Sequence, residues 1–350
     1  MKKDFQGIKS VDVRNTGFFI SLALTVLVLF ILDILFGSVS LSLSDIAGAF
    51  HDRSDVAGMI IFKFRLPKAV TAVLAGAALS VSGLMMQTLF RNPLAGPYVL
   101  GISSGASLGV AVVLLGFSAF IPAAFVKSSG AWLIAAASWA GAGSIMLLIM
   151  FISIRVKDIL TVLIIGIMLA SGITAVVSIM QYFSSETMLK SYVIWTMGSL
   201  GNVDSAQLRV MAICIIAGLA LALSASKMLN ALLLGDTYAM TLGTNLKRAR
   251  ILIFISTSLL AGTVTAFCGP IGFIGIAVPH IVKFFLRTSN HSVLLPASIL
   301  AGSAILLLSD LISQMPGSET ILPVNAITSL TGIPVIIWVI LKNREYRFSI

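Results

Sequence analysis

Four ionisable side chains stand inside or beside long apolar stretches of this 350-residue chain. Asp33, Lys283 and Asp310 fall near the ends of such stretches. His280 lies close to the middle of one, directly after Pro279. A charge at the centre of a membrane helix costs about 2.5–3.5 kcal/mol on insertion scales, so a residue of this kind usually marks a transport route. Two interpretations of His280 stay open: a packed, neutral histidine at a helix break, or a side chain that lines a path.

No set of residues in the sequence has the spacing of a catalytic or metal-binding site. A Gly-x-x-x-x-Gly-Lys-Ser/Thr phosphate loop and a His-Glu-x-x-His motif are both absent. Cys214 and Cys268 fall in apolar stretches, which favours buried thiols over a disulfide or a metal site. We therefore expect no enzyme activity, no metal and no cofactor in this chain. An ion-coupled carrier would need a chain of Asp, Glu or His across the membrane, and none is visible, so we expect the energy source to lie in another protein.

The composition predicts the class of protein. Hydrophobic residues make up 58% of the chain and charged residues 10%, with a mean hydropathy of +1.06. A soluble surface cannot be built from so few charges. We predict an all-α polytopic membrane protein in which residues 1–350 form a single transmembrane domain. The net charge of +10 does not indicate nucleic acid as a partner, because the cations lie between apolar runs, where contact with membrane lipid explains them.

A bilayer core requires about 20 apolar residues per helix. The first apolar run is long enough to be a retained span and not a cleaved signal. If residues 1–15 are cytoplasmic, sixteen Lys and Arg fall on the cytoplasmic side and seven outside, which accounts for all 23. This bias predicts that both termini are cytoplasmic and that the number of spans is even. The ten predicted spans are 16–36, 67–90, 98–117, 131–154, 159–182, 207–226, 250–268, 271–287, 294–312 and 323–341.

The longest polar interruption on the predicted cytoplasmic side is the stretch 227–250. Asp236 has the residue type of a helix N-cap for a short helix at 237–242, and Gly243 suits the left-handed position that ends a helix. The stretch either touches another protein or lies on lipid headgroups, with its last cations anchoring the next span. Four residues of the short helix offer contact or close approach: Tyr238, Ala239, Met240 and Leu242.

A stiff turn is predicted between the second and third spans. Pro93 and Pro97 exclude a continuous helix there. Asn92 precedes a proline, which favours extended backbone at that position. The turn carries Asn92 and Leu94 at the predicted cytoplasmic end, and a tight interhelical loop without a further role is the alternative.

Small residues repeat at a spacing of four in the same two spans. Gly76 and Ser80 share one helical face, and Gly101, Gly105 and Gly109 share another. Membrane helices approach one another through small residues, because lipid tails do not drive them together. We favour packing within one subunit over a dimer seam for these faces.

Six segments together resemble the permease subunits of type II ABC importers, which take up ferric siderophores, haem or cobalamin. The resemblance covers the chain from about residue 37 onward, and so many long motifs in the same order are specific. The segments are RLPK at 65–68, AGAALSVSGLMMQ at 75–87, RNPLAGPYVLGISSGAS at 91–107, LGDTYAMTLGTNLKRAR at 234–250, CGPIGFIGIAVPHIVKFF at 268–285 and ILPVNAITSLTGIPVIIWVIL at 321–341.

The resemblance implies ten helices per subunit and a homodimer with a translocation path along its axis. It also implies two cytoplasmic ATP-binding-cassette ATPase subunits that bind ATP and Mg, an external or periplasmic substrate-binding protein, and a bacterial cytoplasmic (inner) membrane location. A ferric siderophore is the favoured substrate on this resemblance, with haem or cobalamin as alternatives. An ion-gradient-driven transporter or channel without an ATPase is the alternative from another class.

The resemblance also assigns roles to individual residues. The family's cytoplasmic gate falls on Asn92 and Leu94, and docking of the binding protein falls on Arg65 and Lys68. Lys68 stands where Arg is more usual and so lacks the bidentate fork, and Gln314 stands where another cation is often found. Snorkelling of both cations to the membrane interface is the alternative to docking. The ATPase-coupling element falls on Gly235, Asp236, Tyr238, Ala239, Leu242 and Gly243.

Overall fold

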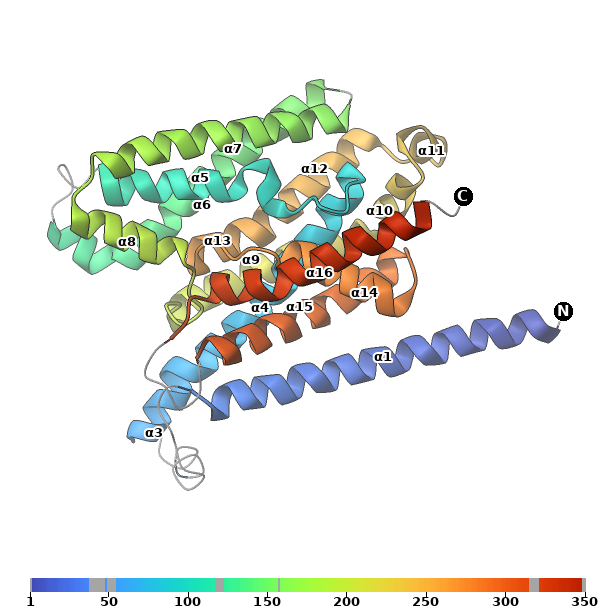
Figure 1. Cartoon of the computed structure of the whole chain (residues 1–350), viewed down its shortest axis with the longest axis horizontal. Helices are drawn as coiled ribbons and strands as arrows, with labels where there is room; N and C mark the ends of the chain where they lie inside the picture. The colour runs from blue at the N-terminus through green and yellow to red at the C-terminus, as the bar shows by residue number, and fades with distance from the viewer. Residues whose placement is uncertain are drawn as a thin grey trace.

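The computed structural model describes residues 2–37, 48, 55–116, 123–156, 158–314 and 321–347, and the regular structure of these residues is helical. Figure 1 shows the long helices running side by side along a common direction. Seven of the described helices are long and apolar enough to cross a membrane, judged by length and composition. Shorter apolar helices lie at the other three expected spans: Ile102–Gly116, Ile274–Leu286 and Val324–Trp338. The membrane class is confirmed, while ten crossings and the cytoplasmic termini stay predictions.

Each of the ten predicted ranges overlaps a helix. The long helices are α1 (Lys2–Leu35), α4 (Leu66–Phe90), α5 (Ile102–Ala111), α6 (Ala123–Arg155), α7 (Ile159–Tyr182), α9 (Ser205–Ser224), α12 (Leu246–Thr257), α14 (Ile274–Leu286), α15 (His291–Ser313) and α16 (Val324–Arg347). The short helices are α3 (Val56–Met59), α8 (Glu186–Thr196), α10 (Ser226–Leu233), α11 (Asp236–Thr241) and α13 (Thr263–Cys268). Single turns of other helix types are η1 (Ile60–Arg65), η2 (Pro97–Leu100), η3 (Val112–Gly116) and η4 (Ser258–Gly262).

The second predicted span begins earlier in the structure than in the sequence. Helical structure starts at Val56 and continues through η1 into α4, instead of starting at residue 67. Pro67, in the first turn of α4, has no backbone N–H to donate. The π-helical turn η1 ends two residues before this proline, so the helix extends upstream of the start that the sequence predicted.

α4 forms the centre of the bundle, and glycines let its neighbours approach. A Cβ atom on Gly76 would lie 2.2 Å from the carbonyl oxygen of Gly302 in α15. In the same way, a Cβ on Gly105 of α5 would lie 2.5 Å from the carbonyl oxygen of Gly141 in α6, and one on Gly109 would collide with the α6 backbone at 2.0 Å. These contacts confirm that the small-residue faces pack within one subunit.

The expected helix break at His280 is wrong. α14 runs from Ile274 to Leu286 with Pro279 inside it. A proline leaves the carbonyl four residues earlier, here that of Gly275, without its usual helical donor. A Cβ on Gly83 of α4 would lie 1.8 Å from that oxygen, so α4 packs closely against the interrupted position. This close packing supports α14 at the turn where Pro279 removes a backbone hydrogen bond.

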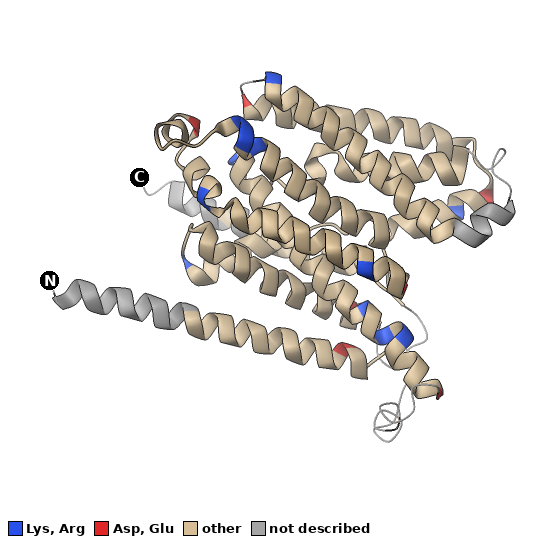
Figure 2. Ribbon diagram, turned by 180° about the vertical axis from the view of Figure 1, so that it is seen from behind, with Lys and Arg blue, Asp and Glu red and all other residues tan. Residues whose placement is uncertain are grey.

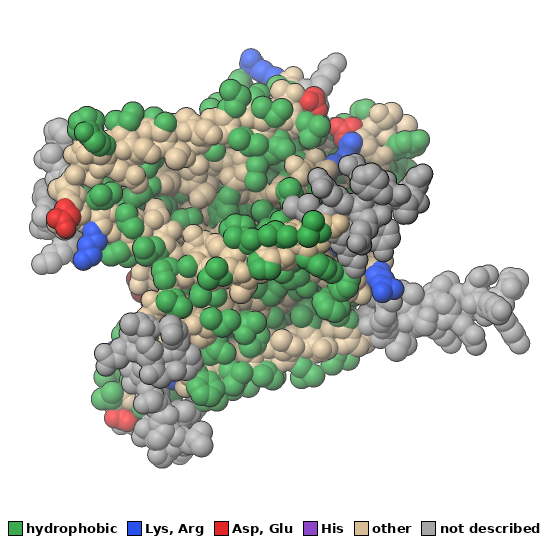
Figure 3. Space-filling view, viewed as in Figure 1, with side chains coloured by type: hydrophobic (Ala, Val, Ile, Leu, Met, Phe, Trp, Pro, Cys, Tyr) green, Lys and Arg blue, Asp and Glu red, His purple; other side chains and the backbone are tan. Residues whose placement is uncertain are grey.

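Charge and exposure divide the molecule into an apolar middle and two polar ends. Figure 2 shows most Lys, Arg, Asp and Glu residues toward the ends of the helices, and Figure 3 shows hydrophobic side chains over the length between them. α1 lies along one edge of the bundle (Figure 1), and only 6% of its apolar window is buried, against 83% for the helix that contains α4. α1 therefore packs on the bundle with one face of half-buried side chains, such as Phe18, Leu22 and Val26, and leaves its other face exposed.

Candidate functional site

The short helix α11 stands at one end of the bundle (Figure 1). It spans Asp236–Thr241, and Gly243 follows with φ +80°. The amide of Thr244 donates to the carbonyl oxygen of Ala239 at 2.9 Å, and the amide of Gly243 donates to that of Met240 at 2.9 Å. This pair of bonds is the glycine-terminated helix end that the sequence predicts at Gly243.

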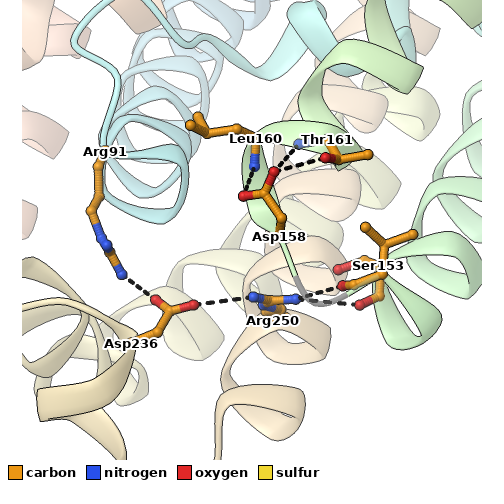
Figure 4. A network of polar contacts seen from close by, with 8 residues as sticks. Arg91, Ser153, Asp158, Leu160, Thr161, Asp236 and Arg250 are labelled. Carbon is orange, nitrogen blue, oxygen red and sulfur yellow. Dashed lines mark hydrogen bonds and ion pairs between the residues drawn. The ribbon is translucent and has the colours of Figure 1, made fainter.

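The predicted capping role of Asp236 is wrong. Asp236 is the first residue of α11, Gly235 occupies the N-cap position, and no side-chain cap bond is formed there. The carboxylate is held by two arginines instead (Figure 4): Arg91 Nη2 donates to Oδ1, and Arg250 Nη2 donates to Oδ2 at 3.2 Å. Asp236 lies one residue too far along the chain to be the N-cap, and charge-assisted bonds to two guanidinium groups satisfy its carboxylate instead.

These two arginines come from different parts of the bundle. Arg91 follows the last residue of α4 and has left-handed backbone, with φ 47°. Arg250 is buried in the second turn of α12, and its Nη1 donates to the carbonyl oxygens of Ser153 at 3.4 Å and Val156 at 3.2 Å. The Asp236 cluster, defined as Arg91, Asp236, Arg250 and these two carbonyl groups, thus joins α4, α11, α12 and the end of α6 (Figure 4).

The adjacent start of α7 has its own cap. Asp158 accepts from the Thr161 hydroxyl at 2.7 Å and from the amides of Leu160 and Thr161, both at 3.1 Å (Figure 4). The Thr161 hydroxyl first, and then the Leu160 amide, lower the pKa of Asp158 from its ordinary value by favouring the ionised form. This carboxylate stabilises the α7 end next to the Asp236 cluster.

α11 and its C-cap residue Leu242 expose three large side chains. Tyr238, Met240 and Leu242 are 67%, 55% and 64% exposed, whereas Ala239 is fully buried. The structure therefore places the three large side chains where the sequence expects contact and Ala239 where it expects close approach. Large apolar side chains gathered on an exposed polar stretch are typical of a protein interaction surface.

The predicted turn after α4 is present and is braced on two sides. Within it, the Asn92 side-chain oxygen accepts from the amide of Leu94 at 2.9 Å, and the Asn92 carbonyl oxygen accepts from that of Ala95 at 3.0 Å. His280 Nε2 lies 2.8 Å from the Pro93 carbonyl oxygen. A carbonyl only accepts, so His280 carries the hydrogen on Nε2 and donates it. His280 thus braces the turn from α14, a contact that sequence reasoning did not find, and its pathway-lining role stays a prediction.

Arg65 and Lys68 lie toward the opposite end of the bundle. Arg65 is 5% exposed, and its Nη1 donates to the carbonyl oxygens of Ile34 at 2.9 Å and Leu35 at 2.7 Å. Lys68 Nζ lies 2.7 Å from an oxygen of Asp310. Both cations therefore have partners within the chain, and docking of another protein on them stays a prediction.

A buried polar cluster surrounds Lys68. Asp33 and Asp310 are 0% and 3% exposed. Gln314 Nε2 donates to Asp33 Oδ1 at 2.8 Å and to Asp310 Oδ2 at 2.9 Å, and Lys68 Nζ lies 3.9 Å from Asp33 Oδ1. Gln314, at the position where the resemblance expects a cation, thus bridges two carboxyl groups. The cluster joins α1, α4 and α15.

The all-helical bundle and its apolar middle define a polytopic membrane protein. Residues 24–342 match the FecCD transport family, and the chain belongs to that family. The match covers nearly all of the described helices, so it applies to the whole bundle and not to one motif.

Named relatives and a solved structure agree with this assignment. The vitamin B12 import system permease protein BtuC of Salmonella typhi is 35% identical over 333 residues, which cover 95% of this chain and 97% of that protein. The protein of the same name from Salmonella newport shows the same identity and coverage. A solved inward-facing structure of a metal-chelate type ABC transporter has a TM-score of 0.81 and 29% sequence identity, covering 93% of this chain and 99% of that one. The resemblance to ABC importer permeases is confirmed.

Proposed function

We propose that this chain is the membrane-spanning subunit of an ATP-driven importer for a large metal-containing chelate. Two copies would form the permease in a bacterial cytoplasmic (inner) membrane, with both termini cytoplasmic. Two ATPase subunits would bind ATP and Mg on the cytoplasmic side, and an external binding protein would deliver the substrate. The observation that carries this proposal is the geometry around α11. Tyr238, Met240 and Leu242 are exposed there, and Asp236 forms an ion pair with Arg91, the residue before Asn92.

The proposed mechanism is alternating access. The ATPase contacts the exposed face of α11, and ATP binding shifts that helix as a rigid body. The shift opens and closes the gate around Asn92 and Leu94. Leu94 is 42% exposed, so its side chain has room to change neighbours as the turn moves.

We infer the substrate class from the family, and its candidate members are a ferric siderophore, haem and cobalamin. A ferric siderophore is favoured by the breadth of the importers that the sequence resembles. Cobalamin is favoured by the named relatives, which are vitamin B12 permeases at 35% identity. Shared fold does not fix the ligand, because specificity depends on the residues of the binding site.

The test is uptake into proteoliposomes that contain the permease, its ATPase and its binding protein. A panel of a ferric hydroxamate siderophore, haem and cobalamin, each radiolabelled, is offered with and without internal ATP. We expect one class to be taken up only with ATP. Uptake that persists without ATP and follows an imposed ion gradient would instead support the self-sufficient carrier.

A further inference from the structure

α11 has little packing surface of its own. It lies mainly against α10 and α12, and Ala239 is the residue of α11 that is buried. A helix of six residues cannot hold its position by helix propensity, so tertiary contacts must supply it. One such contact is the ion pair of Asp236 with Arg91, which connects α11 to the end of α4.

The two arginines that hold Asp236 are fixed to different extents. The Arg250 side chain is 10% exposed and is also bonded to carbonyl oxygens at the end of α6. The Arg91 side chain is 43% exposed. Water and salt weaken an exposed ion pair more than a buried one. Arg250 therefore anchors Asp236 to α6 and α12, while the contact with Arg91 is the more exposed of the two and connects α11 to the end of α4.

Arg91 is continuous with the gate turn, defined as residues 91–95. The Asn92 amide donates to the carbonyl oxygen of Gln87 at 3.2 Å, and Asn92 and His280 brace the rest of the turn through the bonds described above. The bonds from the Leu94 and Ala95 amides to Asn92 hold the turn together, while the bonds to Gln87 and His280 connect it to α4 and α14. A displacement of the Arg91 side chain by Asp236 is thus passed to Asn92 and Leu94.

We propose that Asp236 is a positioning residue for transport, whose carboxylate couples the position of α11 to that of the gate turn through Arg91. The proposal rests on the function proposed above, in which α11 receives the motion of an ATPase. Without the carboxylate, the ATPase still binds and hydrolyses ATP, but the gate turn no longer follows α11. The effect is a loss of coupling and not a loss of assembly.

The test uses the assembled complex of the full chain, its ATPase and its binding protein in lipid. Asp236→Asn and Arg91→Gln each remove one charge of the ion pair, and the variant with both changes completes a double-mutant cycle. Spin labels at Leu94→Cys and Thr241→Cys report the distance between the gate turn and α11 with Mg-ATP and with ADP-vanadate. Matching complexes that retain Leu94 and Thr241 are assayed for ATP hydrolysis and for uptake of a ferric hydroxamate and of cobalamin.

In the parent complex we expect a narrow distance distribution that is preserved between nucleotide states. Each single variant should broaden this distance distribution. It should also lower the uptake per ATP hydrolysed by about five- to tenfold, which is the lower part of the range typical of coupling between two sites. ATP hydrolysis should be retained. The double variant should be no worse than the worse single variant, because both remove the same contact.

The matched control is Arg155→Gln. It removes another exposed cation near the same end of the bundle, where Arg155 lies 4.4 Å from the centre of the Phe151 ring, and it should leave the distance and the coupling unchanged. Narrow distances with normal uptake per ATP in both single variants would overturn the inference, as would loss of the ATPase from the Asp236→Asn complex. A parent complex that does not couple ATP to uptake counts instead against the proposed function.

Discussion

Lys68 Nζ lies 2.7 Å from Asp310 Oδ2, and Asp310 is almost fully buried. The pair joins α4 to α15, and Gln314 extends it to Asp33 near the end of α1. Taking ions out of water costs several kcal/mol each, so buried charges persist only with close partners. We infer that this cluster and the Arg65 bonds to the α1 carbonyls fix one end of that helix, in addition to the half-buried apolar contacts along its length.

Lys68→Ala should therefore destabilise the protein. The change leaves Asp33 and Asp310 close together without their cation. Breaking a buried pair typically costs about 3–5 kcal/mol, and we expect the lower end because the Lys68 side chain is 15% exposed. Thermal unfolding of the purified protein in detergent measures the effect. Lys63→Ala is the matched control, because Lys63 is exposed on the same continuous helix, and equal Tm values for the two variants would contradict the prediction.

A test of binding-protein docking on Lys68 needs a variant that removes the lysine charge without leaving the Asp310 carboxylate unpaired. Lys68→Gln combined with Asp310→Asn neutralises both members of the ion pair and keeps polar groups in place. If Lys68 captures an acidic partner, binding of the substrate-binding protein should weaken, and the loss should be larger at low salt, where screening is weaker. Capture measured by surface plasmon resonance that is unchanged at every salt concentration would leave Lys68 with its structural role alone.

The sequence predicted the long helices because runs of about 20 apolar residues are a property of local composition. Glycine at 243 was also predictable, since its left-handed backbone is a local requirement. The role of Asp236 was not, because capping preference is local while its partner Arg91 lies 145 residues away. Gln314 and Asp33 are 281 residues apart, and no periodicity or motif connects them. Packing brought both sets together.

Gly83→Ala tests the approach of α4 to α14. The added Cβ would lie 1.8 Å from the carbonyl oxygen of Gly275, so the backbone itself must shift. Overpacking of this kind costs about 1–3 kcal/mol and occasionally more, and we expect the upper part of that range because the obstacle is backbone. Gly143→Ala is the control, since a Cβ there meets nothing within 4 Å. The prediction fails if the two variants have the same Tm in detergent.

Gly243→Val tests whether the end of α11 matters for transport and not for folding. A Cβ at Gly243 meets nothing within 4 Å, so the change creates no collision, but φ is +80°. Left-handed backbone costs an L-residue roughly 1–2 kcal/mol, and a β-branched residue tolerates it least. The variant should remain in the membrane with a Tm a few degrees below that of the parent, while ATPase association or ATP-dependent uptake is lost. Gly243→Asn should retain more function, because asparagine adopts this conformation more readily. Normal uptake by Gly243→Val in proteoliposomes would show that transport does not depend on the geometry of this helix end.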